Sequence, residues 1–238
     1  MKAVVQCGGK GTRLRPYTSI LPKPLMPIGT RPVLEMLLKW LRRNNIVDIY
    51  VTTGYLGHLI KSYCGDGRQW GIRLDYTEEI EPLGTVGALS LLRDKLEDTF
   101  LVVNGDILTD LNLNTFITHH KQNNVLLTIA TTERVRKMDY GVVEETQGVL
   151  MGFKEKPTLV SSVSMGVYCM EPDILEFIPC GTPYGFDDLV LHMLELGIPV
   201  RAFRHSGEWL DLGRAEDFIK AQEIDWDEQA LPLTTRAA

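Results

Sequence analysis

Short apolar runs rich in β-branched residues alternate along this chain with segments of helical periodicity. Four runs have the length and composition of buried strands: KAVVQC (2–7), DIYVTTGY (48–55), FLVVNGD (100–106) and NVLLTIATT (124–132). Helical patterns separate them, for example at 32–46 and 56–65. This alternation predicts an α/β fold in which helices cover a largely parallel sheet.

The first helical pattern predicts a packed surface helix. Its apolar stripe consists of Val33, Leu34, Leu37, Leu38 and Leu41. Pro32 suits the first helical position, Thr30 is placed to cap the helix, and basic residues at its C-terminal end complement the helix dipole. We expect this helix to pack and to carry no chemistry.

The second half of the chain has a different pattern. Turn signals separate YGVVEE (140–145), VLMGFKEKP (149–157) and SSVSMGVYCM (161–170), which predicts antiparallel strands that extend or cover the sheet. Two helical segments follow, at 187–197 and 214–225. Because no repeat, low-complexity tract or linker interrupts the chain, we predict one domain over residues 1–225 and a loose C-terminal tail over 226–238.

Composition and charge narrow the functional classes. The 238 residues are 44% hydrophobic and 24% charged, which suits one globular domain of enzyme size. A formal net charge of -6 argues against nucleic acid as a partner and leaves room for a local pocket that binds small phosphates. No stretch reaches the ~18 to 20 apolar residues of a membrane span, and the N-terminus lacks a signal-peptide pattern. We therefore expect a cytoplasmic protein without a membrane partner.

The four cysteines carry no recognisable motif. Cys7, Cys64, Cys169 and Cys180 lie far apart, so the spacing indicates neither a zinc site nor a redox pair. The five histidines likewise show no metal-ligand spacing, and we expect none of them to be catalytic.

A glycine-rich loop follows the first strand. It is not a dinucleotide-binding GxGxxG, because Leu14 stands where the third glycine belongs, and no GK[ST] closes a Walker loop. Backbone amides at Gly8, Gly9 and Gly11 can nevertheless approach an anion closely. Thr12 adds a hydroxyl and Arg13 a guanidinium fork, so the loop is predicted to hold a triphosphate.

Lys23 lies ten residues after Arg13, in the stretch LPKPLMPIG (21–29). Prolines at 22, 24 and 27 stiffen this stretch and would hold the ammonium group at low entropic cost. We therefore predict a functional lysine rather than a solvated one.

Seven motifs resemble those of the sugar nucleotidyltransferases, also called nucleoside-diphosphate-sugar pyrophosphorylases. They are GGKGTRLRPYTSILPKPLMPIGTRP (8–32), EPLGTVGAL (81–89), NGD (104–106), YGVV (140–143), FKEKP (153–157), SMGVY (164–168) and WLDLGRAEDF (209–218). The resemblance implies a Rossmann-like, three-layer α/β fold. It also implies a magnesium-dependent reaction in which a sugar 1-phosphate attacks the α-phosphorus of a nucleoside triphosphate, giving a nucleotide sugar and pyrophosphate.

The resemblance assigns roles to individual residues. The catalytic set would be Arg13, Lys23, Asp106 and Lys156. Mg²⁺ would be held by Asp106 and Asp211. The nucleotide would contact Gln6, Gly8, Gly9, Gly11, Thr12, Arg13, Glu79, Pro82, Gly84 and Thr85. The sugar phosphate would contact Tyr140, Gly141, Glu155, Lys156 and Ser164. Family members often form dimers or tetramers, so the resemblance is compatible with a homo-oligomer.

Four positions bear on the substrates. Gln6 and Cys7 stand where relatives often have leucine and alanine, and Gln6 is predicted either to contact the nucleobase or to bond neighbouring backbone. Ser164 stands where asparagine is common, which leaves the sugar open. Glu79 precedes Pro82 where thymidylyltransferases carry glutamine. A carboxylate only accepts, and guanine offers two adjacent donors, so GTP is favoured over UTP, dTTP, CTP or ATP.

The motifs resemble those of mannose- and heptose-type guanylyltransferases more than those of glucose-type thymidylyltransferases. A uridylyl- or thymidylyltransferase acting on glucose 1-phosphate or another hexose 1-phosphate is the main alternative. A non-catalytic protein that binds nucleotide sugars is a second one, although such relatives would be expected to lose Arg13, Lys23 or a metal carboxylate. No hexapeptide repeats follow the domain, so we expect no fused β-helix acyltransferase.

Overall fold

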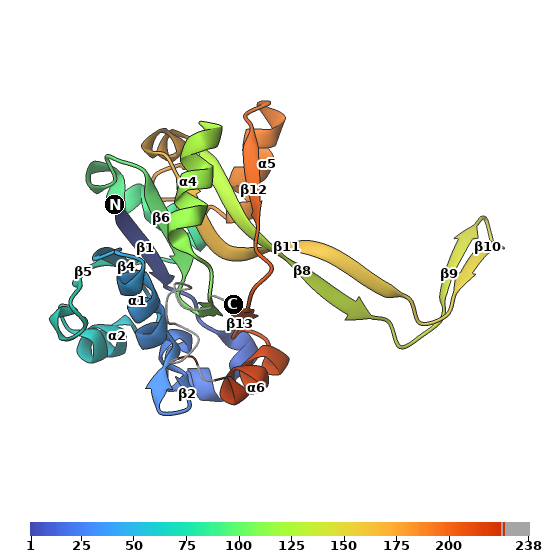
Figure 1. Cartoon of the computed structure of the whole chain (residues 1–238), viewed down its shortest axis with the longest axis horizontal. Helices are drawn as coiled ribbons and strands as arrows, with labels where there is room; N and C mark the ends of the chain where they lie inside the picture. The colour runs from blue at the N-terminus through green and yellow to red at the C-terminus, as the bar shows by residue number, and fades with distance from the viewer. Residues whose placement is uncertain (225, 227–238) are drawn as a thin grey trace, which may run out of the picture.

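A seven-stranded sheet forms the centre of the protein, whose computed structural model describes residues 1–224 and 226 (Figure 1). The strand order is β12-β8-β11-β6-β1-β4-β5. The strands are β1 (Lys2–Cys7), β4 (Asp48–Thr53), β5 (Arg73–Glu78), β6 (Phe100–Asn104), β8 (Leu127–Lys137), β11 (Thr158–Met170) and β12 (Val200–Arg204). β5, β4, β1 and β6 are parallel, and β12 is parallel to β8. β11 is antiparallel to both of its neighbours, β6 and β8. The predicted mostly parallel sheet with an antiparallel second half is thus confirmed.

Helices cover both faces of this sheet. They are α1 (Val33–Arg43), α2 (Gly57–Cys64), α3 (Gly84–Gly87), α4 (Leu113–Asn123) and α5 (Phe186–Glu195). A further helix, α6 (Ala215–Glu223), packs in a separate apolar cluster away from this sheet. Ala3 and Val5 of β1 face a core that contains side chains of α1, α2 and α4. Val4 points to the opposite face and packs with side chains of α3, of the 3-10 helix η5 (Ala88–Lys95) and of α5. Since neighbouring strand residues point to opposite faces, β1 is buried in the middle of three layers.

The start of α1 differs from the prediction. The helix begins at Val33 with Pro32 as its N-cap, and no side chain caps it, so Thr30 has no capping role. The reason is a small antiparallel bridge between β2 (Pro27–Ile28) and β3 (Arg31–Pro32), in which Pro32 takes part as a strand residue. The Val33 N–H donates to the Met26 carbonyl at 3.1 Å, so backbone replaces the expected side-chain cap.

Two short ladders complete the fold. β7 (Ile107–Thr109) pairs with β13 (Trp209–Asp211), and β9 (Val142–Thr146) pairs with β10 (Val149–Lys154). β8 and β11 run together far beyond the sheet and carry the β9–β10 hairpin at their end, away from the body (Figure 1). The predicted antiparallel strands therefore exist, but this hairpin projects from the sheet and does not cover it.

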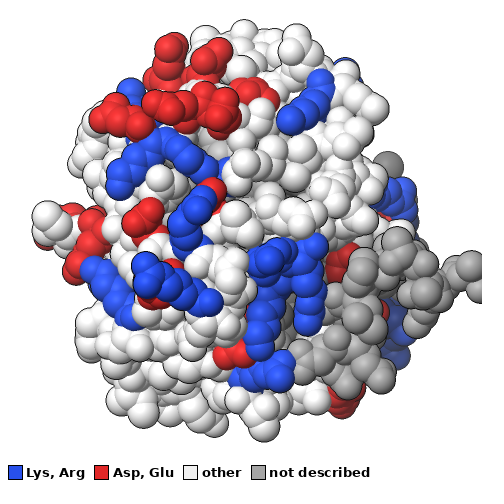
Figure 2. Space-filling model, turned by 60° about the vertical axis from the view of Figure 1, so that its left-hand side comes forward, with Lys and Arg blue, Asp and Glu red and all other residues white. Residues whose placement is uncertain are grey.

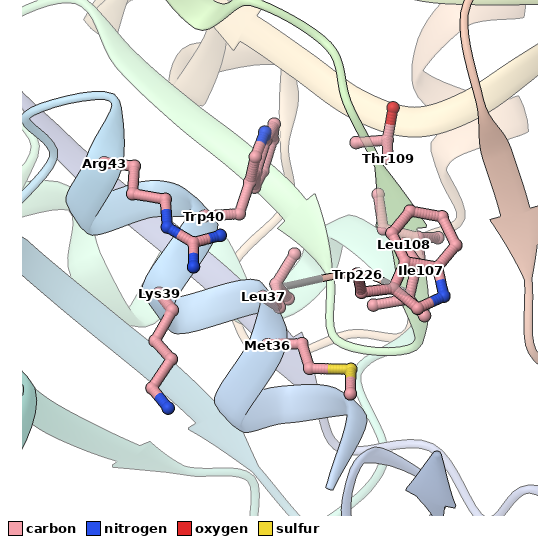
Figure 3. A pocket seen from close by; sticks show the side chains of 9 residues that line it. All are labelled: Met36, Leu37, Lys39, Trp40, Arg43, Ile107, Leu108, Thr109 and Trp226. Carbon is pink, nitrogen blue, oxygen red and sulfur yellow. The ribbon is translucent and has the colours of Figure 1, made fainter. Parts of the chain in front are cut away.

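A third apolar cluster joins the C-terminal part to α1 and β7. It contains Val33, Leu108, Leu210 and Trp226, and the Trp226 ring lies beside Ile107 and Leu108 (Figure 3). Trp226 is the first residue of the predicted tail, and only 8% of its surface is exposed. The rest of that tail, residues 227–238, lies outside the described residues.

The surface carries charges of both signs. Lys and Arg side chains lie among Asp and Glu side chains over the face drawn in Figure 2. Within the described residues, no helix is long and apolar enough to cross a lipid bilayer. Three of the four cysteines, Cys7, Cys64 and Cys169, are buried and unpaired.

A buried histidine joins α4 to the sheet. His120 is 1% exposed, with Nδ1 2.7 Å from Thr128 Oγ1 and Nε2 3.1 Å from Glu171 Oε1. Because a carboxylate only accepts, we place the proton on Nε2, and Nδ1 then accepts from the Thr128 hydroxyl. Burial lowers the pKa of this imidazole, and the interaction with Glu171 only partly opposes that effect.

His120 should therefore make stability depend on pH. The unfolded chain takes up a proton near pH 6.5 that the folded state resists, so the free energy of unfolding should fall as pH drops below about 6.5, by at most ~1.4 kcal/mol per pH unit. Urea denaturation across this range measures the slope. His120→Gln should flatten it, whereas the same change at the exposed His58 should not. Equal slopes in both variants would contradict this role.

Candidate functional site: a polar crevice at the switch point of the sheet

The pocket lies where the strand order of the sheet reverses direction. From β1 the chain proceeds to β4 and β5 on one side, and then returns to β6 on the other side of β1. Loops that leave the carboxyl ends of β1 and β6 therefore diverge and leave a crevice between them. The glycine loop follows β1 directly, and Asp106 follows β6 after two residues.

The crevice is a cavity of about 390 Å³. Nine of the residues predicted for the site line it: Gln6, Gly9, Gly11, Thr12, Arg13, Lys23, Thr85, Asp106 and Asp211. Gly11 adopts φ 59 and precedes a short 3-10 helix, Thr12–Leu14. The Thr18 hydroxyl donates to the Gly11 carbonyl at 2.8 Å, and a Cβ on Gly11 would lie 3.0 Å from Thr18 Cγ2. The turn thus favours glycine both for its backbone conformation and for the closeness of Thr18.

Lys23 lies between the two aspartates predicted to hold a metal. Its Nζ forms an ion pair with Asp106 Oδ2 and lies 3.6 Å from Asp211 Oδ1. The Lys23 side chain is only 14% exposed. Asp211 Oδ1 also accepts the Gly213 N–H at 2.9 Å, and a Cβ on Gly213 would collide with the lysine. Two carboxylates thus converge on one cation beside the glycine loop.

A second part of the crevice extends toward Glu79. A connected hollow of about 290 Å³ is lined by Gln6, Gly8, Gly9, Glu79, Pro82, Gly84 and Thr85, among others. Glu79 Oε2 accepts the Leu83 N–H at 2.9 Å, and a Cβ on Gly8 would collide with the other carboxylate oxygen. Burial raises the pKa of the Glu79 carboxyl, and the hydrogen bond from Leu83 opposes this.

Gln6 bonds neighbouring backbone in this structure. Its side-chain amide donates to the Thr85 carbonyl, which ties the end of β1 to the start of α3. This is the second of the two roles that the sequence left open. Gln6 nevertheless lines both parts of the crevice.

The residues predicted for the sugar phosphate are not brought to this crevice within the chain. Tyr140, Gly141, Glu155 and Lys156 flank the β9–β10 hairpin, far from the body (Figure 1). Lys156 is exposed and has φ 44, a strained conformation for a residue with a side chain. Ser164 lies nearer the sheet, and its hydroxyl donates to Tyr168 Oη at 3.2 Å.

Comparison with known proteins assigns the family. Residues 2–228 match the family model described as Nucleotidyl transferase. The chain belongs to this family. It is 34% identical to a protein of Synechocystis sp. named UTP–glucose-1-phosphate uridylyltransferase, over 93% of this chain and 62% of that protein. It is 30% identical to a probable mannose-1-phosphate guanylyltransferase 2 of Oryza sativa, over 100% of this chain and 68% of that protein. The chain thus spans roughly two thirds of the length of these two curated relatives.

Solved structures share the fold. HddC from Yersinia pseudotuberculosis matches with a TM-score of 0.75 and 26% identity, over 93% of this chain and 98% of that one. Another structure of HddC, described as complexed with GMP-PN, matches with a TM-score of 0.73. The resemblance to sugar nucleotidyltransferases is therefore confirmed at the level of the family and the fold.

Two residues that the sequence did not single out, Asp217 and Arg134, hold Asp211 in place. The Asp211 N–H donates to Asp217 Oδ2 at 3.0 Å, and Asp217, which is 4% exposed, forms a two-pronged pair with the Arg134 guanidinium. That guanidinium also stacks over Trp209, 4.6 Å from the ring centre. Asp217 lies in the quoted motif WLDLGRAEDF, but nothing in the sequence connects it to Arg134, 83 positions away.

Breaking this pair should cost stability. Arg134→Met leaves the Asp217 carboxylate buried without its cation, which should lower the free energy of unfolding by ~3–5 kcal/mol. The matched control is Arg204→Met, because Arg204 pairs with Glu133 on the surface at 2.6 Å. That exposed pair should be worth less than ~1 kcal/mol. Urea denaturation measures both variants, and a similar loss in each would show that burial of Asp217 is not the cause.

Proposed function

We propose that the protein transfers a nucleotidyl group from a nucleoside triphosphate to a sugar 1-phosphate and releases pyrophosphate. GTP and a mannose- or heptose-type 1-phosphate are the favoured pair. The observation that carries this proposal is the placement of Lys23 between Asp106 and Asp211, within a cavity that the glycine loop and Arg13 also line. This arrangement puts cationic groups and metal-binding oxygens where two polyanions would have to meet.

The reaction requires positioning and charge neutralisation rather than a general base. A sugar phosphate is already ionised, so its oxygen can attack the α-phosphorus without losing a proton. What opposes the reaction is repulsion between the two phosphates and the entropy of aligning them. Backbone amides of the glycine loop, the Arg13 guanidinium and the Lys23 ammonium would draw negative charge from the triphosphate as pyrophosphate leaves.

Asp106 and Asp211 fit a magnesium ion. Both offer hard carboxylate oxygens, and together they already hold one cation, the Lys23 ammonium. No group of three or more acidic, His or Cys side chains suited to a metal is found among the described residues, so phosphate oxygens and water would complete the coordination. Mg²⁺, when bound, would supply further neutralisation of the phosphates. If Asp106 and Asp211 bound Mg²⁺, Lys23 Nζ would be released from them and could pair with phosphate oxygens.

The preference for guanine rests on Glu79. It lines the second part of the crevice as a half-buried carboxyl group, and an ionised carboxylate could accept both donors on the Watson-Crick edge of guanine. The rice relative and the HddC structure complexed with GMP-PN support this choice. The Synechocystis relative favours a uridylyltransferase acting on glucose 1-phosphate, which is the second candidate.

The first experiment is pyrophosphate release over five nucleoside triphosphates combined with mannose, glucose, heptose and N-acetylhexosamine 1-phosphates. We expect one strongly preferred pair, and loss of turnover when EDTA removes the metal. Tight binding of a nucleotide sugar by calorimetry, without any turnover, would instead favour a non-catalytic binding protein.

Asp106→Asn should lower turnover by ~100-fold or more, because the amide has about the same size but loses the negative charge that holds the metal. Circular dichroism and thermal unfolding establish that the variant is folded. Asp75→Asn, at an exposed position of β5, is the matched control and should leave turnover unchanged. Full activity of Asp106→Asn would rule out the assigned metal ligand.

Glu79→Gln should shift the nucleotide preference away from guanine. A carboxylate has two oxygens that can each accept a hydrogen bond, whereas the amide has one accepting oxygen and a donating NH2 group. We expect kcat/KM for GTP to fall by ~10-fold or more relative to UTP. Glu81→Gln, two residues further along and exposed, serves as the control. If the ratio does not change, the base is read elsewhere in the crevice.

A further inference from the structure

An arm of the chain, residues 132–163, projects from the edge of the body (Figure 1). The pairing of β8 with β11 continues outward from Thr131↔Ser164 to Lys137↔Thr158, and the Met138 N–H then donates to the Pro157 carbonyl at 3.0 Å. At about 3.3 Å per residue, this ribbon places Lys156 ~20 Å beyond the point where β12 stops pairing with β8.

The base of the arm is fastened to the body. Glu133 pairs with Arg204 of β12 at 2.6 Å, and Arg134 pairs with the buried Asp217. Continuous strand pairing stiffens the ribbon beyond these contacts. The direction of the arm is therefore set by the body, and it holds the hairpin away from the pocket of the same chain.

Exposed apolar side chains are far denser on the arm than on the rest of the described chain. Of the nineteen exposed large hydrophobic side chains among residues 1–224 and 226, nine belong to it: Val135, Tyr140, Val143, Val149, Leu150, Met151, Phe153, Leu159 and Val160. Leu159 and Val160 are successive strand residues, so both faces of the ribbon are apolar. A two-stranded hairpin is marginally stable in water, and a concentration of exposed apolar side chains marks an interaction surface.

The body has a matching surface next to the pocket. Tyr17 and Ile20, in the segment after the glycine loop, are 66% and 80% exposed. Ile80 is 95% exposed and lines a hollow together with Gly8, Glu79 and Pro82. Exposed apolar side chains thus lie on the segments that follow the glycine loop and β5. The crevice holds groups for a triphosphate, but neither Glu155 nor Lys156 lines it.

We infer that two copies of the chain exchange arms, so that the hairpin of each copy covers the pocket of the other. Glu155 and Lys156 of one copy would then complete the site that Arg13, Lys23 and Asp106 of the other copy begin. Each chain has one uncovered arm and one incomplete pocket, so a two-fold exchange satisfies both at once. The functional part of this inference rests on the proposed function, because the role of Lys156 does.

Complementation between two inactive variants tests the exchange. Lys156→Ala affects only the arm and Lys23→Ala affects only the body, and each alone should lose about 100-fold or more of turnover. Co-expression with two different affinity tags yields the mixed dimer. Exchanged arms give it one intact site of two, so it should regain about half of the wild-type turnover.

The matched control is the mixed dimer of Lys23→Ala and Asp106→Asn. Both changes lie on the body, so this dimer should stay inactive whichever chain supplies the arm. If the dimer of Lys156→Ala and Lys23→Ala is also inactive while the wild type turns over, the hairpin serves its own chain and the inference is wrong. Full activity of Lys156→Ala alone would overturn it as well.

Crosslinking gives a readout that does not depend on activity. Two lots of wild-type protein, one labelled with ¹⁵N, are unfolded, mixed and refolded together, and an amine-reactive reagent then joins lysines. With equal lots, about half of the crosslinks between Lys156 of the arm and Lys10 of the glycine loop should be of mixed isotope, because half of the dimers then contain one chain of each kind. Crosslinks within one isotope only, or a monomer by light scattering, would refute the exchange. Mixed crosslinks without turnover would keep the exchange and remove the proposed function.

Discussion

One ammonium group between two carboxylates determines how the pocket is organised. Lys23 pairs with Asp106 and lies near Asp211, although the three residues come from distant segments. The β7–β13 ladder sets Asp211 opposite Ile107, and the Leu212 N–H donates to the Asp106 carbonyl at 3.0 Å. Two carboxylates held this close would repel each other without a cation. Because one ammonium group and two carboxylates lie together, the position offers a cation for phosphate oxygens and anionic oxygens for a metal ion.

The hydrophobic layers keep this polar centre in place. β1 has neighbours on both edges and cores on both faces, so the loop that follows it starts from a fixed point. Asp106 leaves the next strand, β6, at the same edge of the sheet. Asp211 is held from behind by Asp217 and Arg134. A site for polyanions depends on such support, because the charged groups gain most when they need not rearrange on binding.

The arm divides the molecule into parts with different physical demands. The body buries most of its large apolar side chains in three clusters, whereas the much shorter arm exposes nine. Contact with another surface would bury these apolar side chains and so stabilise the arm. The base of the arm is also connected to Asp211, because Arg134 pairs with Asp217, which accepts the Asp211 N–H. Association of two chains would therefore affect the pocket in two ways: the partner's arm would cover it, and the contacts of Arg134 and Asp217 behind Asp211 would be held in place.

Periodicity and motifs in the sequence determined the α/β class, the parallel first half, the antiparallel second half and the residues that gather around the glycine loop. These features depend on local spacing or on a continuous strand-loop pattern, which the sequence shows directly. The prediction that Thr30 caps α1 was wrong. Pro32 is the N-cap instead, because it takes part in the bridge between β2 and β3 directly before the helix. The partners of Lys23, the pairing of Arg134 with Asp217 and the direction of the arm appeared only in the tertiary structure. The two pairs join residues 83 positions apart, and the direction of the arm follows from strand pairing at its base. Such geometry is set by the packing of the whole chain rather than by any local pattern.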